Sequence, residues 1–184
     1  MEYTVIRSRR KTLSMQVKRD GQVEIRAPLR TTDAEIRRFL DKHRHWLEAH
    51  LQKAQALQQA KAGVRKLTGA ETAELKKKAK RDLPERVAYW APLIGVRPGR
   101  IAVRCQKTRW GSCSTKGNLN FNCLLMLAPD DVVDYIVVHE LCHLKHMNHS
   151  RQLYAEIEKL LPDYRQHQQC LKENGEFLLA MVEA

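Results

Sequence analysis

The stretch Val137-Val138-His139-Glu140-Leu141-Cys142-His143 decides how the rest of the chain is interpreted. Residues four apart lie on one face of a helix, so His139 and His143 can bind one metal ion together. Glu140 points about 100° further round the helix, a direction that suits a general base acting on a metal-bound water better than a ligand. The apolar residues around the motif indicate a buried helix rather than a surface helix with chance histidines.

A third ligand is needed, because a catalytic zinc commonly has three protein ligands and one open position for water. His146 lies seven residues beyond His139, which is about 10 Å along one helix and too far for convergence on one ion. His149 can converge only if the chain turns back after His146, and Asn148 is a residue type that tolerates the left-handed conformation ending a helix. The predicted ligands of zinc, or of another divalent metal, are His139, His143 and His149.

The length of 184 residues is typical of one domain with a core of its own. No stretch has the apolar length of a membrane helix, and the N-terminal residues lack the charged-then-apolar pattern of a signal peptide. Five cysteines without a Cys-x-x-Cys pair argue against a disulfide framework. We therefore expect a cytoplasmic protein with reduced cysteines and no membrane partner.

The positive charge is concentrated in the first part of the chain. Residues 1–110 contain 27 Lys and Arg against 11 Asp and Glu, a net charge of +16, whereas residues 111–184 contain 6 against 10, a net charge of −4. This asymmetry indicates attraction to polyanions, for example nucleic acid or nucleotide phosphates, through the basic N-terminal half. An ordinary solvated basic surface is the alternative, and the sparse aromatic residues do not indicate a base-stacking surface.

The helix that contains the predicted ligands His139 and His143 is called the metal helix below. Local sequence patterns predict the elements that precede it. Alternating apolar residues on both sides of Asp20-Gly21 predict a β-hairpin. Thr32-Asp33-Ala34-Glu35 is typical of a capping box and begins one long amphipathic helix, which should end at Gly63. A second helix should begin near Thr72, and Pro84 should break or kink it.

The second half is predicted to contain two strands and three helices. The strands are expected around 101–105 and 119–123, with a loop between them. The metal helix should begin at Pro129-Asp130-Asp131, since acidic residues stabilise a helix N-terminus. A further helix should follow Ser150, and Asp163 should cap the last one. Cys113 is interpreted as a packing residue rather than a nucleophile.

Three stretches of the sequence together resemble a known family. Arg109-Trp110-Gly111-Ser112-Cys113, the histidine motif over 139–143 and Asn148-His149-Ser150 are similar to the YgjP-like (DUF45) metal-dependent hydrolases, which are related to the zincin metallopeptidases, including WLM and SprT-like proteases. The resemblance implies an α+β, zincin-like fold in which a small β-sheet packs on the metal helix. It also implies that an extended peptide pairs with a sheet edge above the metal, for which Asn118–Asn122 is the candidate strand.

The chain is therefore interpreted as a single YgjP-like metallopeptidase domain over 1–184. It comprises a basic N-terminal hairpin and long helix over 1–62 and a metal-site core over 68–184. The favoured function is a zinc-dependent metallopeptidase that acts on protein or peptide, with Glu140 as the general base. Residues that could contact substrate or an anion are Lys107, Arg109 and Lys145.

Two other functions remain open. A metal-dependent nucleoside-triphosphate pyrophosphohydrolase or phosphohydrolase could use the same metal, with the basic residues holding phosphates. A nucleic-acid-binding module with a structural zinc is the third possibility, although structural zinc sites are usually closed by four ligands.

Overall fold

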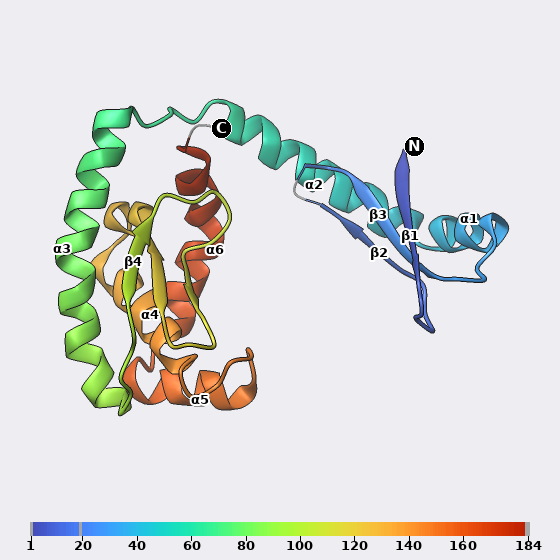
Figure 1. Cartoon of the computed structure of the whole chain (residues 1–184). Helices are drawn as coiled ribbons and strands as arrows, with labels where there is room; N and C mark the ends of the chain where they lie inside the picture. The colour runs from blue at the N-terminus through green and yellow to red at the C-terminus, as the bar shows by residue number, and fades with distance from the viewer. Residues whose placement is uncertain (1, 19, 183–184) are drawn as a thin grey trace. The chain divides into compact units, whose positions relative to one another are not determined.

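The computed structural model describes residues 2–18 and 20–182 (Figure 1). The chain divides into two compact units, Met1–Gly63 and Val64–Ala184. No helix among the described residues is both long and apolar enough to cross a membrane.

The first unit contains a three-stranded sheet of β1 (Tyr3–Ser8), β2 (Ser14–Val17) and β3 (Val23–Pro28). The strand order is β1-β3-β2, with β3 parallel to β1 and antiparallel to β2. The predicted hairpin is therefore confirmed as the β2–β3 pair. Strand β1 was not predicted, because an edge strand that is mostly exposed does not need the apolar alternation that marks a half-buried strand.

Two helices, α1 (Asp33–Lys42) and α2 (Arg44–Ala62), follow the sheet. Thr32 and Glu35 form the predicted capping box at the start of α1. The prediction of one long helix is wrong at His43, where φ −110° and ψ 21° interrupt the helical backbone. Ile36 of α1 and Leu47 of α2 are both buried with the apolar face of β3, and they form the core of this unit.

The second unit begins with the long helix α3 (Gly69–Ile94). Thr68 and Glu71 form a capping box, so the helix begins earlier than the predicted Thr72. Pro84 lies inside the helix and does not end it. Gly95 ends it in the left-handed conformation with φ 76°, which glycine adopts at little cost.

The sheet of the second unit consists of β4 (Ile101–Arg104), β5 (Gly111–Cys113) and β6 (Leu119–Asn122). The strand order is β4-β6-β5, with β6 parallel to β4 and antiparallel to β5. The prediction that the strand around 118–122 offers a free edge is therefore wrong, because both edges of β6 are paired. The free edge next to the metal helix belongs to β5, which is too short to show a sequence pattern.

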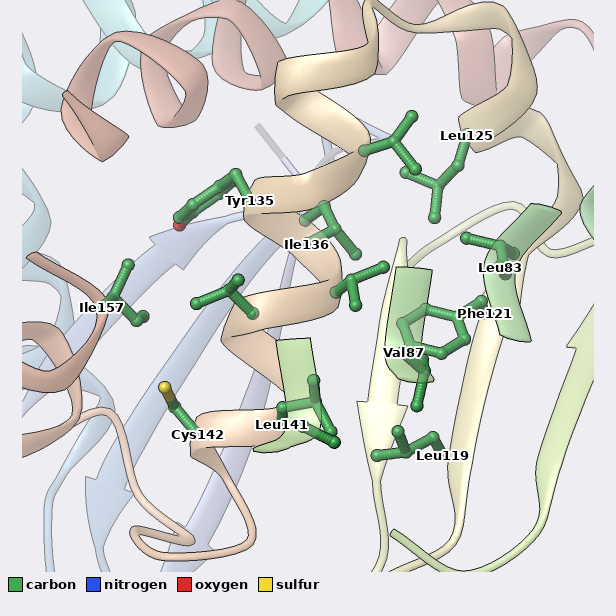
Figure 2. Close-up of a cluster of buried hydrophobic side chains, with 14 of the residues drawn as sticks. Leu83, Val87, Leu119, Phe121, Leu125, Tyr135, Ile136, Leu141, Cys142 and Ile157 are labelled. Atoms are coloured by element: carbon green, nitrogen blue, oxygen red, sulfur yellow. The ribbon is translucent and has the colours of Figure 1, made fainter. Parts of the chain in front are cut away.

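The metal helix α4 (Asp130–Cys142) packs on this sheet, as Figure 2 shows for Leu119 and Phe121 on β6 and Leu141 on α4. These three side chains are almost completely buried. The remaining elements are a 3-10 helix, η1 (Cys123–Leu127), and the helices α5 (Arg151–Leu160) and α6 (Tyr164–Ala180). The fold is α+β, with a small sheet packed on the metal helix, as predicted.

Candidate metal centre

The three histidines of the predicted site lie together at the end of α4. The Nε2 atom of His139 lies 3.2 Å from Nε2 of His143 and 3.2 Å from Nε2 of His149. Nitrogen ligands of a tetrahedral zinc, at about 2.0–2.1 Å from the ion, are separated by about 3.4 Å. The arrangement therefore fits three ligands around one ion, and the ligand atoms of the cluster all lie within 4.8 Å of one another.

The chain reverses direction directly after His143, which is the C-cap of α4. The His143 ring is fixed because its Nδ1 donates a hydrogen bond to the backbone oxygen of His146, 2.9 Å away. This bond assigns the proton to Nδ1 and leaves the Nε2 lone pair free for a metal. The imidazole of His146 does not belong to the cluster.

The reversal differs in detail from the sequence prediction. Helix α4 ends at Cys142, so the predicted stop near Asn148 is wrong, and no described residue other than glycine has a positive φ. The left-handed conformation predicted for Asn148 is therefore wrong as well. Ser150 caps α5 by accepting a hydrogen bond from the backbone N–H of Leu153, and this cap fixes the residue that follows His149.

His139 and His143 lie in an environment that favours their neutral form. Burial, together with the smaller effects of the neighbouring His143 and His149, lowers the pKa of His139 to about 3. Burial also lowers the pKa of His143 below its ordinary value. Neutral imidazole is the form that binds a metal ion, so the rings of His139 and His143 are ready to act as ligands at neutral pH.

Glu140 is buried beside the histidines, with only 5% of its surface exposed. Burial raises the pKa of its carboxyl to about 7, and the positive charge of Arg109 opposes this shift. Its Oε2 atom has no hydrogen-bond partner among the described residues. A buried carboxyl whose pKa is close to neutral can both accept and release a proton.

Strand β5 closes the other side of this carboxyl. A Cβ atom placed on Gly111 would lie 2.6 Å from Glu140 Oε1 and 2.7 Å from its Cγ atom. Real Cβ atoms do not approach other atoms so closely, so only glycine at this position allows the observed packing. Gly111 therefore sets the place of the Glu140 carboxylate relative to the histidines.

The Gly111→Ala variant is expected to fold and to lose about 100-fold in kcat for any reaction that depends on Glu140, because the added methyl group displaces the carboxylate by about 1 Å. Steady-state kinetics and a thermal melt of the same sample measure the two effects. Gly69→Ala is the matched control, since its Cβ would meet no atom within 4 Å. Equal activity of both variants would contradict the assigned role of Gly111.

Asn122 joins the end of β6 to the segment that precedes β5. Its buried side-chain amide donates hydrogen bonds to the backbone oxygens of Gln106, at 2.7 Å, and Arg109, at 2.9 Å. Its side-chain oxygen accepts from the backbone N–H of Leu124, and its own backbone N–H donates to the oxygen of Trp110. One side chain therefore fixes the entry to both β5 and η1.

Asn122→Ala is expected to lower the free energy of unfolding by about 2–4 kcal/mol, because buried backbone groups lose their partners. Chemical denaturation measures this loss. Asn120→Ala on the same strand should cost less than about 1 kcal/mol, since the Asn120 side-chain oxygen has no hydrogen-bond partner among the described residues. If the two variants lose the same stability, Asn122 does not have the structural role described.

A cavity of about 420 Å³ adjoins the three histidines and Glu140. Residues 110–113 line this cavity together with Tyr135, Gln168 and Leu171. Sequence reasoning missed these last three, which fall within ordinary helical periodicity. Trp110 lies against α6, because a Cβ atom on Gly175 would come within 3.1 Å of its ring.

The three predicted substrate residues lie in different places. Arg109 lies close enough to Glu140 for its charge to lower the pKa of that carboxyl. Lys145 instead lies near Glu156, with 3.9 Å between its Nζ and Oε2 of that residue, and does not line the cavity. Lys107 is exposed and does not line the cavity either.

Comparison with known proteins places this centre in a family. The YgjP-like, metallopeptidase domain matches residues 11–74 and 65–174. A search of curated proteins gives no match.

Solved structures that resemble the chain include two metallopeptidase zymogens. Abylysin of Pyrococcus abyssi is 22% identical, with a TM-score of 0.45, over 50% of this chain and 93% of that chain. Jannalysin of Methanocaldococcus jannaschii is 19% identical, with a TM-score of 0.46, over 51% of this chain and 97% of that chain. Because the family match spans most of the sequence, the chain belongs to the YgjP-like family with its metallopeptidase domain and is a metal-dependent hydrolase.

Proposed function

We propose that the chain is a zinc-dependent peptidase in which His139, His143 and His149 hold the metal and Glu140 is the general base. The convergence of three Nε2 atoms at zinc-ligand spacing beside a buried carboxyl carries this proposal. Three neutral imidazoles leave the full charge of the ion in place, and a set of three protein ligands is typical of catalytic rather than structural zinc.

When bound, zinc would act as a Lewis acid and lower the pKa of water to about 7. Glu140 takes up the proton that the attacking water loses, because its carboxyl faces the cavity that the histidines line. The same carboxyl then delivers that proton to the leaving amine. The charge of Arg109 favours the ionised carboxylate in which the cycle begins.

The free edge of β5 is the proposed binding place for the peptide. One edge of Gly111–Cys113 pairs with β6, while residues 111–113 also line the cavity beside the histidines. An edge strand offers unpaired N–H and C=O groups to an extended chain. A peptide that adds to β5 as a further strand therefore passes beside Glu140 and the histidines.

The test of this function is an assay on the full chain loaded with zinc, in which an unfolded protein and a set of nucleoside triphosphates are offered separately. We expect new peptide N-termini, no pyrophosphate or phosphate, and a loss of activity on chelation that added zinc restores. Release of pyrophosphate or phosphate without peptide cleavage would overturn the proposal and assign the chain to phosphoanhydride hydrolysis.

A further inference from the structure

A second cavity, of about 410 Å³, lies against the outer face of the β4-β6-β5 sheet. Asn120 lies between two core residues of β6, so its side chain points to the face opposite the core. Its register partners Ala102 on β4 and Ser112 on β5 share this face. All three line the cavity together with Arg100, Arg104 and Arg109, and we call this cavity the arginine groove.

The lining of the arginine groove is positively charged. Its described lining contains three exposed guanidinium groups and no carboxylate. Arg100 and Arg104 form no ion pair within residues 2–18 and 20–182. By contrast, Arg86 in the same unit pairs with Asp134 at 2.7 Å. The guanidinium groups of Arg100 and Arg104 are therefore available for paired hydrogen bonds with an anionic ligand.

The arginine groove adjoins the metal centre through strand β5. Ser112 and Cys113 line both cavities, so this strand separates the arginine groove from the histidines and Glu140. A peptide paired with β5 directs alternate side chains to the two faces of the sheet. The paired stretch is short, because β5 has three residues, and the flanking parts of the peptide can therefore turn onto the outer face, past Arg109.

We propose that the arginine groove is a specificity site that selects substrates with aspartate or glutamate side chains next to the segment bound along β5. This role rests on the peptidase function proposed above and names the class of its substrate. Carboxylates satisfy guanidinium groups through paired hydrogen bonds, and they complement a groove in which the charged side chains of the described lining are all arginines. The net positive charge of the chain adds long-range attraction for an acidic segment.

A peptide fits this site better than a nucleic acid does. The described lining contains no aromatic side chain on which a base could stack, whereas stacking on aromatic rings is the common basis of single-strand binding. The volume of about 410 Å³ suits a few side chains rather than a nucleic-acid backbone. Its position beside β5 places it where the flanks of a bound peptide emerge.

The experiment uses the full, zinc-loaded chain carrying Glu140→Gln, so that binding is measured without cleavage. Fluorescent peptides share one neutral, extended central segment and carry glutamates, glutamines or lysines on both sides. Fluorescence anisotropy at low salt should give the glutamate peptide an affinity about tenfold higher than the glutamine peptide. The difference should shrink as salt screens the charges.

The Arg100→Gln/Arg104→Gln double variant should reduce this preference to about twofold and leave binding of the glutamine peptide unchanged. Lys77→Gln/Lys80→Gln is the matched control, because it removes the same charge from exposed positions of α3 in the same unit. Equal binding of the glutamate and glutamine peptides would overturn the proposal. An equal loss in the two double variants would also overturn it, because the effect would then be general charge.

Single-stranded DNA is the competing ligand in the same assay. Binding of an oligothymidine that is tighter than that of the glutamate peptide and depends on Arg100 and Arg104 would assign the groove to nucleic acid instead. Peptide cleavage by the wild-type chain distinguishes the proposed peptidase function from the proposed specificity site. If the glutamate peptide binds to the chain and is not cleaved, the proposed peptidase function is wrong. If peptides are cleaved without a preference for glutamate, only the proposed specificity site is wrong.

Discussion

His149→Ala is expected to weaken zinc binding by at least about 100-fold, because even residues that only hydrogen-bond to a metal ligand contribute about 10–100-fold to metal affinity. The Nε2 atom of His149 lies 3.2 Å from that of His139, in the position of a third ligand. Competition with a coloured zinc chelator measures the affinity of the purified chain.

His146→Ala is the control for this variant. Its imidazole is not part of the histidine cluster, and its backbone oxygen accepts the hydrogen bond from Nδ1 of His143. This contact survives the substitution, so zinc affinity should change by less than about threefold, well below the cost of losing an orienting contact. If His146→Ala loses more affinity than His149→Ala, the assignment of the third ligand is wrong.

Glu140→Gln is expected to lower kcat for peptide hydrolysis by about 10²–10⁴-fold, the range that a positioned general base contributes. Glutamine has nearly the same shape, so it fits against Gly111 in the space that the glutamate occupies. It cannot accept the proton of the attacking water. Steady-state kinetics on samples of known zinc content measures the loss.

The zinc content of Glu140→Gln should stay at the wild-type level, because Glu140 is not one of the three clustered ligand residues. This separates loss of the base from loss of the metal. A variant that binds zinc normally and cleaves at the original rate would exclude Glu140 as the base. A variant that binds no zinc would instead indicate that the carboxylate holds the metal.

The sequence predicted the convergence of the histidines because helix geometry determines it. His139 lies on α4 and His143, four residues later, is the C-cap of this helix with helical backbone angles, so their proximity follows from local structure alone. The choice of His149 as the third ligand followed from the need for three protein ligands, because His146 lies too far along a helix from His139 to bind the same ion. The structure places the three Nε2 atoms together, while their role as metal ligands remains a prediction.

The parts of the site that come from tertiary packing could not be predicted in this way. Strand β5 has three residues and pairs on one side only, so no periodicity marks it. The contact of Gly111 with Glu140 joins residues far apart in the sequence. The hydrogen bonds of Asn122 depend on the fold of the segment before β5. A single sequence carries no signal for these long-range contacts.

The predicted α+β class is correct because the alternation of apolar residues in strands and their spacing in helices are local features of the sequence. The predictions were wrong where the structure depends on more than the local apolar pattern. The apolar spacing across residues 36–57 suggested one helix, although the backbone at His43 divides it. Strand β6 was predicted from its alternation, but its central place depends on β4 and β5, which come from other parts of the chain. Alternation identifies a strand and does not reveal which of its edges are paired.

A zinc titration of the metal-free chain, followed by peptide cleavage, tests the central claim most directly. Because one cluster of three histidines is proposed to hold one ion, activity should rise linearly and reach its maximum at one zinc per chain. The point of equivalence should coincide with the zinc content of the purified enzyme. Full peptide cleavage by the metal-free chain would contradict the account, and so would a titration in which bound zinc produces no cleavage.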